Sequence, residues 1–196
     1  STRGRAHLLW EMTKGEVIRD GWRSEEVKQS LDLCLACKGC KSDCPVGVDV
    51  ATYKAEFLSH YYEGRVRPRS AYAFGNIDLW ARVASQAPGL VNLTTQLPFL
   101  RDLSKLVAGV HRRRSIPAFA PETFKNWFFK RRFRNRDRGR SADAPPVLLW
   151  PDTFNNYFQP ATAKAALEVI ESAGFRVLVP RANLCCGRPL YDHGML

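Results

Sequence analysis

The sequence predicts a mainly α-helical protein whose C-terminal part adds a short α/β segment. Two patterns predict this fold class. Apolar residues recur at helical spacing through residues 1–110, and from residue 145 onward a strand, a helix and a second strand follow one another closely. We therefore divide the chain into a helical domain (1–110), a basic linker (111–144) and an incomplete α/β domain (145–196).

Caps and apolar stripes define the helices of the first domain. Acids in a first turn and a Ser or Asp just before it mark helix starts, while glycine marks helix ends and proline breaks a helix. The predicted helices are 5–14 before Gly15, one from Ser24, one from Asp49 to near Gly64, one at about 70–86, and one across 89–109 broken by Pro98.

A βαβ unit is predicted in the last domain. Val147 to Trp150 is a short apolar run bounded by prolines, which is typical of a buried strand. Pro160 suits the start of a helix and Gly174 its end. Residues 175–179 then form the second strand, so we expect two parallel strands joined by a right-handed crossover.

The net charge of +11 is concentrated in two arginine-rich stretches, 111–114 and 130–140. A basic chain invites a nucleic-acid interpretation, but charge confined to a linker is more typical of a solvated connector. We expect no nucleic-acid partner. We expect the linker to be exposed and to dock on an acidic domain or an anionic membrane surface, with Phe124, Trp127 and Phe128 anchoring a short helix against a neighbouring domain.

The strongest local signal is the run Cys34-x-x-Cys37-x-x-Cys40-x-x-x-Cys44-Pro45. Disulfides between such close cysteines are geometrically awkward, and zinc would need a second ligand pair that the sequence does not offer at suitable spacing. The whole pattern matches the bacterial ferredoxin run that binds a [4Fe–4S] cluster. These four cysteines are therefore the candidate metal ligands.

Two arrangements of ligands remain open. All four cysteines could bind a single cluster, or Cys34, Cys37 and Cys40 could share one cluster while Cys44 serves a second, as in two-cluster ferredoxins. The second arrangement needs another cysteine run, which would lie upstream of Ser1. We favour this second arrangement.

The remaining cysteines form the motif Cys185-Cys186-Gly187 after the second predicted strand. Adjacent cysteines can simply be small apolar residues. However, α/β folds build their sites outside the carboxyl ends of parallel strands, and glycine lets the backbone approach a bulky group. We favour a cofactor-binding role for these three residues.

These motifs resemble the C-terminal half of bacterial FAD-linked oxidases. The resemblance rests on Cys34–Pro45 with Gly47 and Asp49, and on the stretches ATYKAEFLSHYY, LLWPDTFNNYF and LCCGRPLYDHGML. Such proteins fuse a flavin dehydrogenase domain to a ferredoxin-like domain and a cysteine-rich CCG domain. The chain is most similar to the D-2-hydroxyglutarate and D-lactate dehydrogenases of this type, and more distantly to the iron–sulfur subunit of glycolate oxidase.

The resemblance implies a role in electron transfer. Electrons that FAD takes from a 2-hydroxy acid would pass through [4Fe–4S] clusters to an acceptor such as a quinone or another carrier. The flavin domain and its FAD site are absent from this sequence, so we expect a segment of a longer protein that has no dehydrogenase activity alone and no catalytic residues. A cytoplasmic location is implied, with peripheral contact at the inner face of the membrane as an open alternative.

Two other functions remain as alternatives. The arginine-rich stretches would suit a nucleic-acid-binding protein with a structural iron–sulfur cluster, whose binding would weaken steeply with salt. The cluster could also serve only to hold the helices together in an interaction module, in which case it would be redox-silent.

Overall fold

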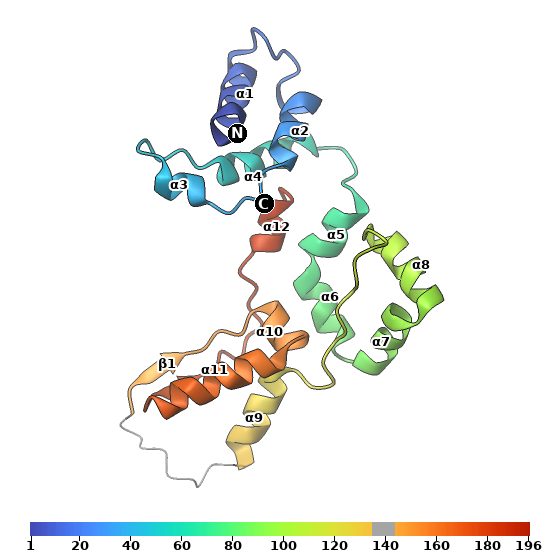
Figure 1. The fold of residues 1–196 in the computed structure, drawn as a ribbon, viewed down its shortest axis with the longest axis vertical. Helices are drawn as coiled ribbons and strands as arrows, with labels where there is room; N and C mark the ends of the chain where they lie inside the picture. The colour runs from blue at the N-terminus through green and yellow to red at the C-terminus, as the bar shows by residue number, and fades with distance from the viewer. Residues whose placement is uncertain (135–143) are drawn as a thin grey trace. The chain divides into compact units, whose positions relative to one another are not determined.

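The computed structural model describes residues 1–134 and 144–196. The described chain is mostly helical and contains a small two-stranded parallel sheet, so the predicted mainly α class is confirmed. Contacts divide the chain into two units, 1–76 together with 187–196, and 77–186 (Figure 1). The predicted domain boundaries at residues 110 and 144 stay a prediction, and the charged stretch 135–143 lies outside the described residues.

The first unit consists of short helices whose caps follow the predicted pattern. Gly15 ends the first helix in the left-handed region, with φ at 72°. The hydroxyl of Ser24 accepts the N–H of Val27, and the carboxylate of Asp49 accepts the N–H of Thr52. The elements are α1 (Thr2–Lys14), η1 (Gly21–Arg23), α2 (Glu25–Asp32), α3 (Gly39–Asp43), α4 (Val50–Tyr61), α5 (Arg69–Gly75) and α12 (Arg188–Asp192).

A compact apolar cluster joins α1, α2 and α4. Phe57 of α4 is fully buried and packs with Val27 and Leu31 of α2. Cys34 and Cys40 are partly buried hydrophobic groups packed against this same cluster. The cysteine run therefore rests on the core of the first unit.

The prediction of a single helix at about 70–86 is wrong, because the helix is interrupted at Asn76. Helix α5 ends at Gly75, and both the backbone N–H and the side-chain amide of Asn76 donate to the carbonyl oxygen of Tyr72. An asparagine side chain that bonds to nearby backbone competes with helix continuation. Helix α6 (Ile77–Ala84) begins the second unit.

The second unit contains the predicted βαβ arrangement. Strand β1 (Pro146–Leu148) pairs in parallel with β2 (Arg176–Leu178), and Val147 lies opposite Val177. Between them lie α10 (Thr153–Tyr157), which the sequence analysis missed, and α11 (Pro160–Ser172). The carboxylate of Asp152 caps α10 by accepting two N–H groups, a signal that the Pro-Asp-Thr stretch contained.

Part of the predicted linker is a packed helix. Helix α9 (Phe124–Arg134) inserts Phe124 and Phe128 into a buried cluster with Leu167 of α11 and Val177 of β2. The predicted aromatic anchors Phe124 and Phe128 therefore pack against the βαβ unit of this same chain.

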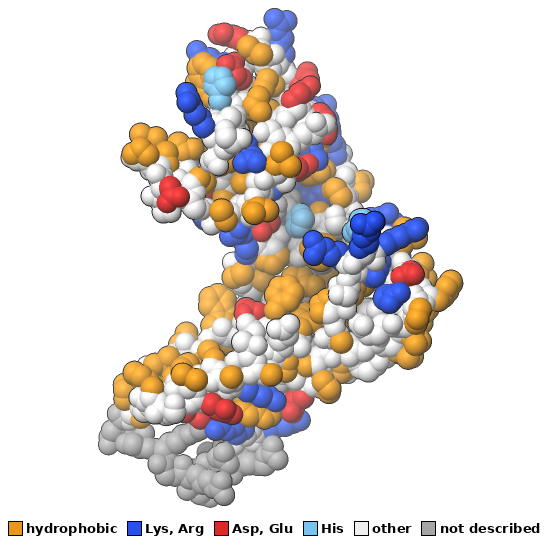
Figure 2. Space-filling model, in the orientation of Figure 1, with side chains coloured by type: hydrophobic (Ala, Val, Ile, Leu, Met, Phe, Trp, Pro, Cys, Tyr) orange, Lys and Arg blue, Asp and Glu red, His pale blue; other side chains and the backbone are white. Residues whose placement is uncertain are grey.

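Helices α7 (Pro88–Gln96) and α8 (Pro98–Ala108) pack against each other on either side of the predicted break at Pro98. Hydrophobic side chains lie at their surface, seen in orange over α7 and α8 in Figure 2. The exposed residues are Leu90, Leu93, Leu97, Phe99, Leu103, Leu106 and Val107. Among the described residues, no helix has both the length and the apolar character needed to cross a membrane.

Candidate functional site

The four-cysteine run lies between α2 and α4. Cys34 follows α2 directly, and its N–H donates to the carbonyl oxygen of Leu31 at 2.9 Å. Cys37 lies in the loop that follows, Cys40 lies in α3, and Cys44 ends α3. Cys37 is exposed and the other three are partly buried, and all four are free thiols. The run therefore lies at the surface, and its Cys34 and Cys40 side chains pack against the core of the first unit.

Two residues of this loop adopt the left-handed conformation. Ala36 has a φ of 50° and Lys38 a φ of 61°, although neither is glycine. Such a conformation costs of order 1 kcal/mol for a residue with a Cβ. Left-handed residues alternating with right-handed ones form a nest of backbone N–H groups, which suits anionic sulfur. The N–H of Ala36 already donates to Sγ of Cys34 at 3.4 Å.

Cys44 has its own set of backbone donors. The N–H groups of Val48 and Val46, and more weakly that of Gly47, lower the pKa of the Cys44 thiol against a smaller opposing effect of burial. Gly47 adopts a φ of 68°, the left-handed region that favours glycine. The chain after Pro45 therefore turns so that its amides stabilise a thiolate, the form of cysteine that binds metals.

Asp49 and Lys38 connect the loop to the start of α4. Nζ of Lys38 lies 3.3 Å from Oδ2 of Asp49. Burial raises the pKa of Asp49, but the N–H and hydroxyl of Thr52 and the ammonium of Lys38 outweigh it, so the pKa is lowered overall. The same carboxylate thus caps α4 and restrains the cysteine loop.

The donor set of this loop fits an iron–sulfur cluster in its chemistry. Four thiols in one run, two left-handed residues between the first three cysteines and an amide that donates to the Cys34 sulfur suit such a cluster. In the described residues, however, no three Cys, His, Asp or Glu side chains are gathered closely enough to hold a metal ion. The assignment of Cys34, Cys37, Cys40 and Cys44 as ligands therefore remains a proposal.

A hollow of about 400 Å³ opens beside Cys34 in the first unit. Lys28, Lys54 and His193 are among the residues that line it. Burial is the main cause that lowers the pKa of His193, with Lys54 and Arg67 adding to it and Asp192 opposing it. The hollow is therefore lined by two lysines, by the carboxylates of Asp32 and Asp192, and by a histidine whose pKa is lowered.

The cysteine pair follows the last strand of the second unit. Cys185 is partly buried and Cys186 is exposed, and both are free thiols after the carboxyl end of β2. Gly187 has a φ of 76°, and a Cβ added there would meet nothing within 4 Å. The left-handed backbone conformation therefore favours glycine at this position, whereas the surroundings leave room for a side chain.

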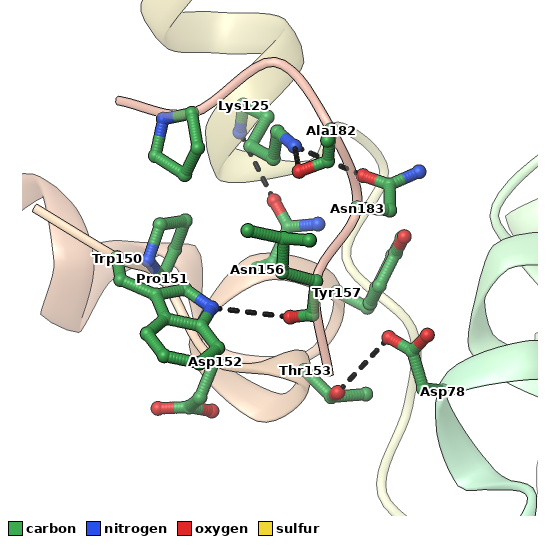
Figure 3. Close-up of a pocket in the computed structure, with 12 residues that line it drawn as sticks. Asp78, Lys125, Trp150, Pro151, Asp152, Thr153, Asn156, Tyr157, Ala182 and Asn183 are labelled. Carbon is green, nitrogen blue, oxygen red and sulfur yellow. Dashed lines mark hydrogen bonds between the residues drawn. The ribbon is translucent and has the colours of Figure 1, made fainter. Parts of the chain in front are cut away.

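The segment before the pair is held by a buried lysine that the sequence analysis missed. Nζ of Lys125 on α9 donates to the carbonyl oxygens of Arg181 and Ala182, at 2.8 and 2.7 Å. It also donates to Oδ1 of Asn183 at 3.0 Å (Figure 3). Nε1 of Trp150 donates to the carbonyl oxygen of Leu184 at 3.1 Å. This segment is thus fixed in place immediately before Cys185.

Burial of Lys125 is tolerated because three oxygens surround its ammonium group. Burial is the main cause that lowers the pKa of Lys125, and Arg82 adds to it while Asp78 opposes it. Its backbone N–H donates to Oδ1 of Asn156, so α9 is tied to α10 at the same point. A lone lysine in an aromatic segment offered no pattern from which this role could be predicted.

Comparisons with known proteins connect the chain to several bacterial dehydrogenases. It is 27% identical over 183 residues, 90% of the chain, to the D-2-hydroxyglutarate dehydrogenase of Pantoea ananatis. It is 25% identical over 221 residues, 98% of the chain, to the probable glycolate oxidase iron-sulfur subunit of Bacillus subtilis. It is 25% identical over 123 residues, 63% of the chain, to a subunit of the anaerobic glycerol-3-phosphate dehydrogenase of Escherichia coli.

The chain spans only part of each of these relatives. It covers 17% of the Pantoea protein, 44% of the Bacillus protein and 30% of the Escherichia protein. No protein-family model matches the chain, and no solved structure matches it. The relatives nevertheless confirm the predicted resemblance to D-2-hydroxyglutarate dehydrogenases and to the iron–sulfur subunit of glycolate oxidase.

Proposed function

We propose that this chain is the iron–sulfur electron-transfer segment of a flavin-dependent 2-hydroxy-acid dehydrogenase. Electrons would pass from FAD, bound in another part of the same polypeptide, through [4Fe–4S] clusters to an acceptor such as a quinone. The observation that carries the proposal is the cysteine run, whose spacing and left-handed loop suit a cluster. The relatives, which include an iron-sulfur subunit and several dehydrogenases, support it.

The ligands are assigned in two groups. Cys34, Cys37 and Cys40 would bind one cluster, and Cys44 would serve a second cluster whose other ligands lie in an upstream run. The separate donors support this division, because the sulfur of Cys34 accepts the N–H of Ala36 while the thiolate form of Cys44 is stabilised by the amides of residues 46–48. A cluster bound there would supply one-electron redox chemistry, and the chain's own residues would orient the thiolates and donate hydrogen bonds to sulfur.

The domain organisation is proposed to follow that of the related oxidases. Residues 1–110 would form the ferredoxin-like domain, 111–144 a basic linker and 145–196 the first part of the CCG domain. Cys185, Cys186 and Gly187 would bind a cofactor in the CCG domain. The fixed segment before the pair supports this role, since a cofactor ligand needs a rigid base.

The experiment is a metal and sulfide analysis of the anaerobically prepared full-length protein. Cys37→Ser should remove about four irons and four sulfides per polypeptide, together with part of the broad thiolate-to-iron absorption. Ser42→Ala is the matched control, because Ser42 lies in the same loop and its hydroxyl donates to the carbonyl oxygen of Gly39. An unchanged iron content in Cys37→Ser would refute the ligand assignment.

A further inference from the structure

Three consecutive carbonyl oxygens of the cysteine loop are bound by two cationic side chains. Nζ of Lys54 on α4 donates to the carbonyl oxygen of Cys34 at 2.7 Å. Nη2 of Arg188 on α12 donates to the carbonyl oxygen of Ala36 and, at 3.4 Å, to that of Leu35. These contacts all lie within the first unit. The backbone between the first two cysteines of the run is therefore held from its carbonyl side.

Arg188 is itself held in place. Its Nε donates to Oδ1 of Asp192, one turn later in α12, at 2.7 Å. The hydroxyl of Tyr191 lies 2.6 Å from Oγ1 of Thr52, and the ammonium of Lys38 lies over the Tyr191 ring. Helix α12 thus contacts both the start of α4 and the cysteine loop. The carboxylate of Asp192 on the same helix orients the guanidinium of Arg188.

The carbonyl contacts determine where the loop amides point. In a tight turn, fixing the C=O groups on one side leaves the N–H groups facing the other side. Ala36 is 3% exposed, adopts its left-handed φ of 50°, and donates its N–H to the Cys34 sulfur. Holding the Ala36 and Leu35 carbonyls stabilises this conformation, which is unfavourable for a residue with a side chain.

The same cations affect the charge that the loop can hold. An iron–sulfur cluster gains one negative charge on reduction, and fixed positive charges and hydrogen bonds near it favour the reduced form. An arginine side chain carries a positive charge in proteins. A cation bound to the loop backbone would therefore affect both the conformation of the cysteine loop and the reduction potential of its cluster.

We propose that Arg188 and Lys54 are positioning residues of the iron–sulfur loop, which hold its carbonyl groups so that its amides face the cysteine sulfurs. Arg188 follows the Cys185-Cys186-Gly187 motif directly in the sequence. The residue next to one cysteine motif therefore holds the backbone of the other. This inference rests on the proposed function only for its effect on a cluster. The loop geometry itself is independent of any cluster.

The first test measures hydrogen exchange of the loop in the full-length protein freed of iron. Arg188→Gln should make the Ala36 amide exchange about tenfold faster or more, because the hydrogen bonds from a charged donor to the Leu35 and Ala36 carbonyls are lost. Arg188→Lys, which keeps the charge but loses the two-carbonyl geometry, should fall between Arg188→Gln and the wild type. Arg67→Gln is the matched control, since Arg67 donates to the carbonyls of His193 and Gly194 without touching the loop.

The second test measures the reduction potential of the cluster in the iron-loaded full-length protein. Arg188→Gln should make one-electron reduction about tenfold less favourable, a fall of about 59 mV. Lys28→Gln is the charge control, because Lys28 also lines the hollow beside Cys34 and, like Arg188, pairs with an acid on its own helix, but its ammonium donates to Asp32 and not to the loop backbone. Its shift should be clearly smaller.

Each result has a defined meaning. If Arg188→Gln exchanges at the wild-type rate, or if Arg67→Gln accelerates exchange equally, the positioning role is refuted. Equal potential shifts in Arg188→Gln and Lys28→Gln would also refute it, because charge alone would explain them. A wild-type protein that binds no cluster would refute the proposed function, and the exchange measurement would still decide the role of Arg188.

Discussion

Lys125→Met is the substitution that best tests how the cysteine pair is supported. Lys125 is 8% exposed, and its ammonium donates to three oxygens of residues 181–183. Methionine keeps most of the apolar stem, so the change removes the charge and its hydrogen bonds with little loss of volume.

The expected loss follows from two opposing effects. Three hydrogen bonds from a charged donor would contribute roughly 1.5–3 kcal/mol each if they were independent. Removal of the ammonium from water costs several kcal/mol, which offsets much of that sum. Residues 181–183 are exposed, so their oxygens regain water in the variant. We therefore expect the local free energy of opening to fall by about 2–3 kcal/mol.

Hydrogen exchange of the full-length protein, followed in α9 and in residues 179–186, measures this loss. Lys130→Met on the same helix is the control, because Lys130 is exposed and forms an ion pair with Glu122. Such a surface pair contributes about 0–1 kcal/mol. Equal exchange in the two variants would refute the structural role of Lys125.

The pH dependence of the same comparison gives a second check. The pKa of Lys125 is lowered in the folded protein from the ordinary value of 10.5, mainly by burial. Between the lowered pKa and 10.5, the unfolded chain binds more protons than the folded chain, so stability rises with pH. The wild type should therefore gain stability relative to Lys125→Met as the pH rises through this window, and a loss would contradict the burial argument.

Three further predictions concern other parts of the chain. In the full-length protein, Ala at both Cys185 and Cys186 should leave flavin reduction by substrate intact and stop acceptor reduction in stopped-flow measurements; wild-type rates for both steps would make the pair purely structural. Arg131→Glu should destabilise the second unit by about 1–3 kcal/mol, because Arg131 lies 2.9 Å from the partly buried Glu171, whereas Arg112→Glu at an exposed site should cost little in the same denaturation assay. Phe57→Ala should cost about 3–5 kcal/mol, since Phe57 is fully buried in the cluster against which Cys34 and Cys40 pack, and a loss below about 1 kcal/mol would contradict this view of the core.

Local chemistry made much of the fold predictable. Ser24 and Asp49 cap helices as the sequence indicated, Pro98 separates α7 from α8, and the strands around 147 and 177 pair in parallel. These features depend on neighbouring residues or on a regular apolar spacing. The end of α5 before Asn76 was missed, because a single asparagine in an otherwise helical pattern is only a weak signal for a helix end.

The supporting contacts of the candidate site could not be predicted, because they join residues far apart in the chain. Arg188 reaches Ala36 across 152 positions, and Lys125 reaches Ala182 across 57. The strand that was expected to include Trp150 ends at Leu148, and the indole Nε1 of Trp150 donates to the carbonyl oxygen of Leu184. Such contacts depend on tertiary packing, for which a single sequence carries no local signal.

The measurement that tests the central claim most directly is rapid-freeze electron paramagnetic resonance of the full-length protein mixed with D-2-hydroxyglutarate or D-lactate. If this chain carries electrons, the substrate that reduces the flavin should next produce the signal of a reduced cluster. The part of that signal that comes from the cluster assigned to Cys34, Cys37 and Cys40 should be missing in Cys37→Ser while flavin reduction continues. The same cluster signal, at the same rate, in Cys37→Ser would contradict the proposal that the run from Cys34 to Cys44 carries electrons from the flavin.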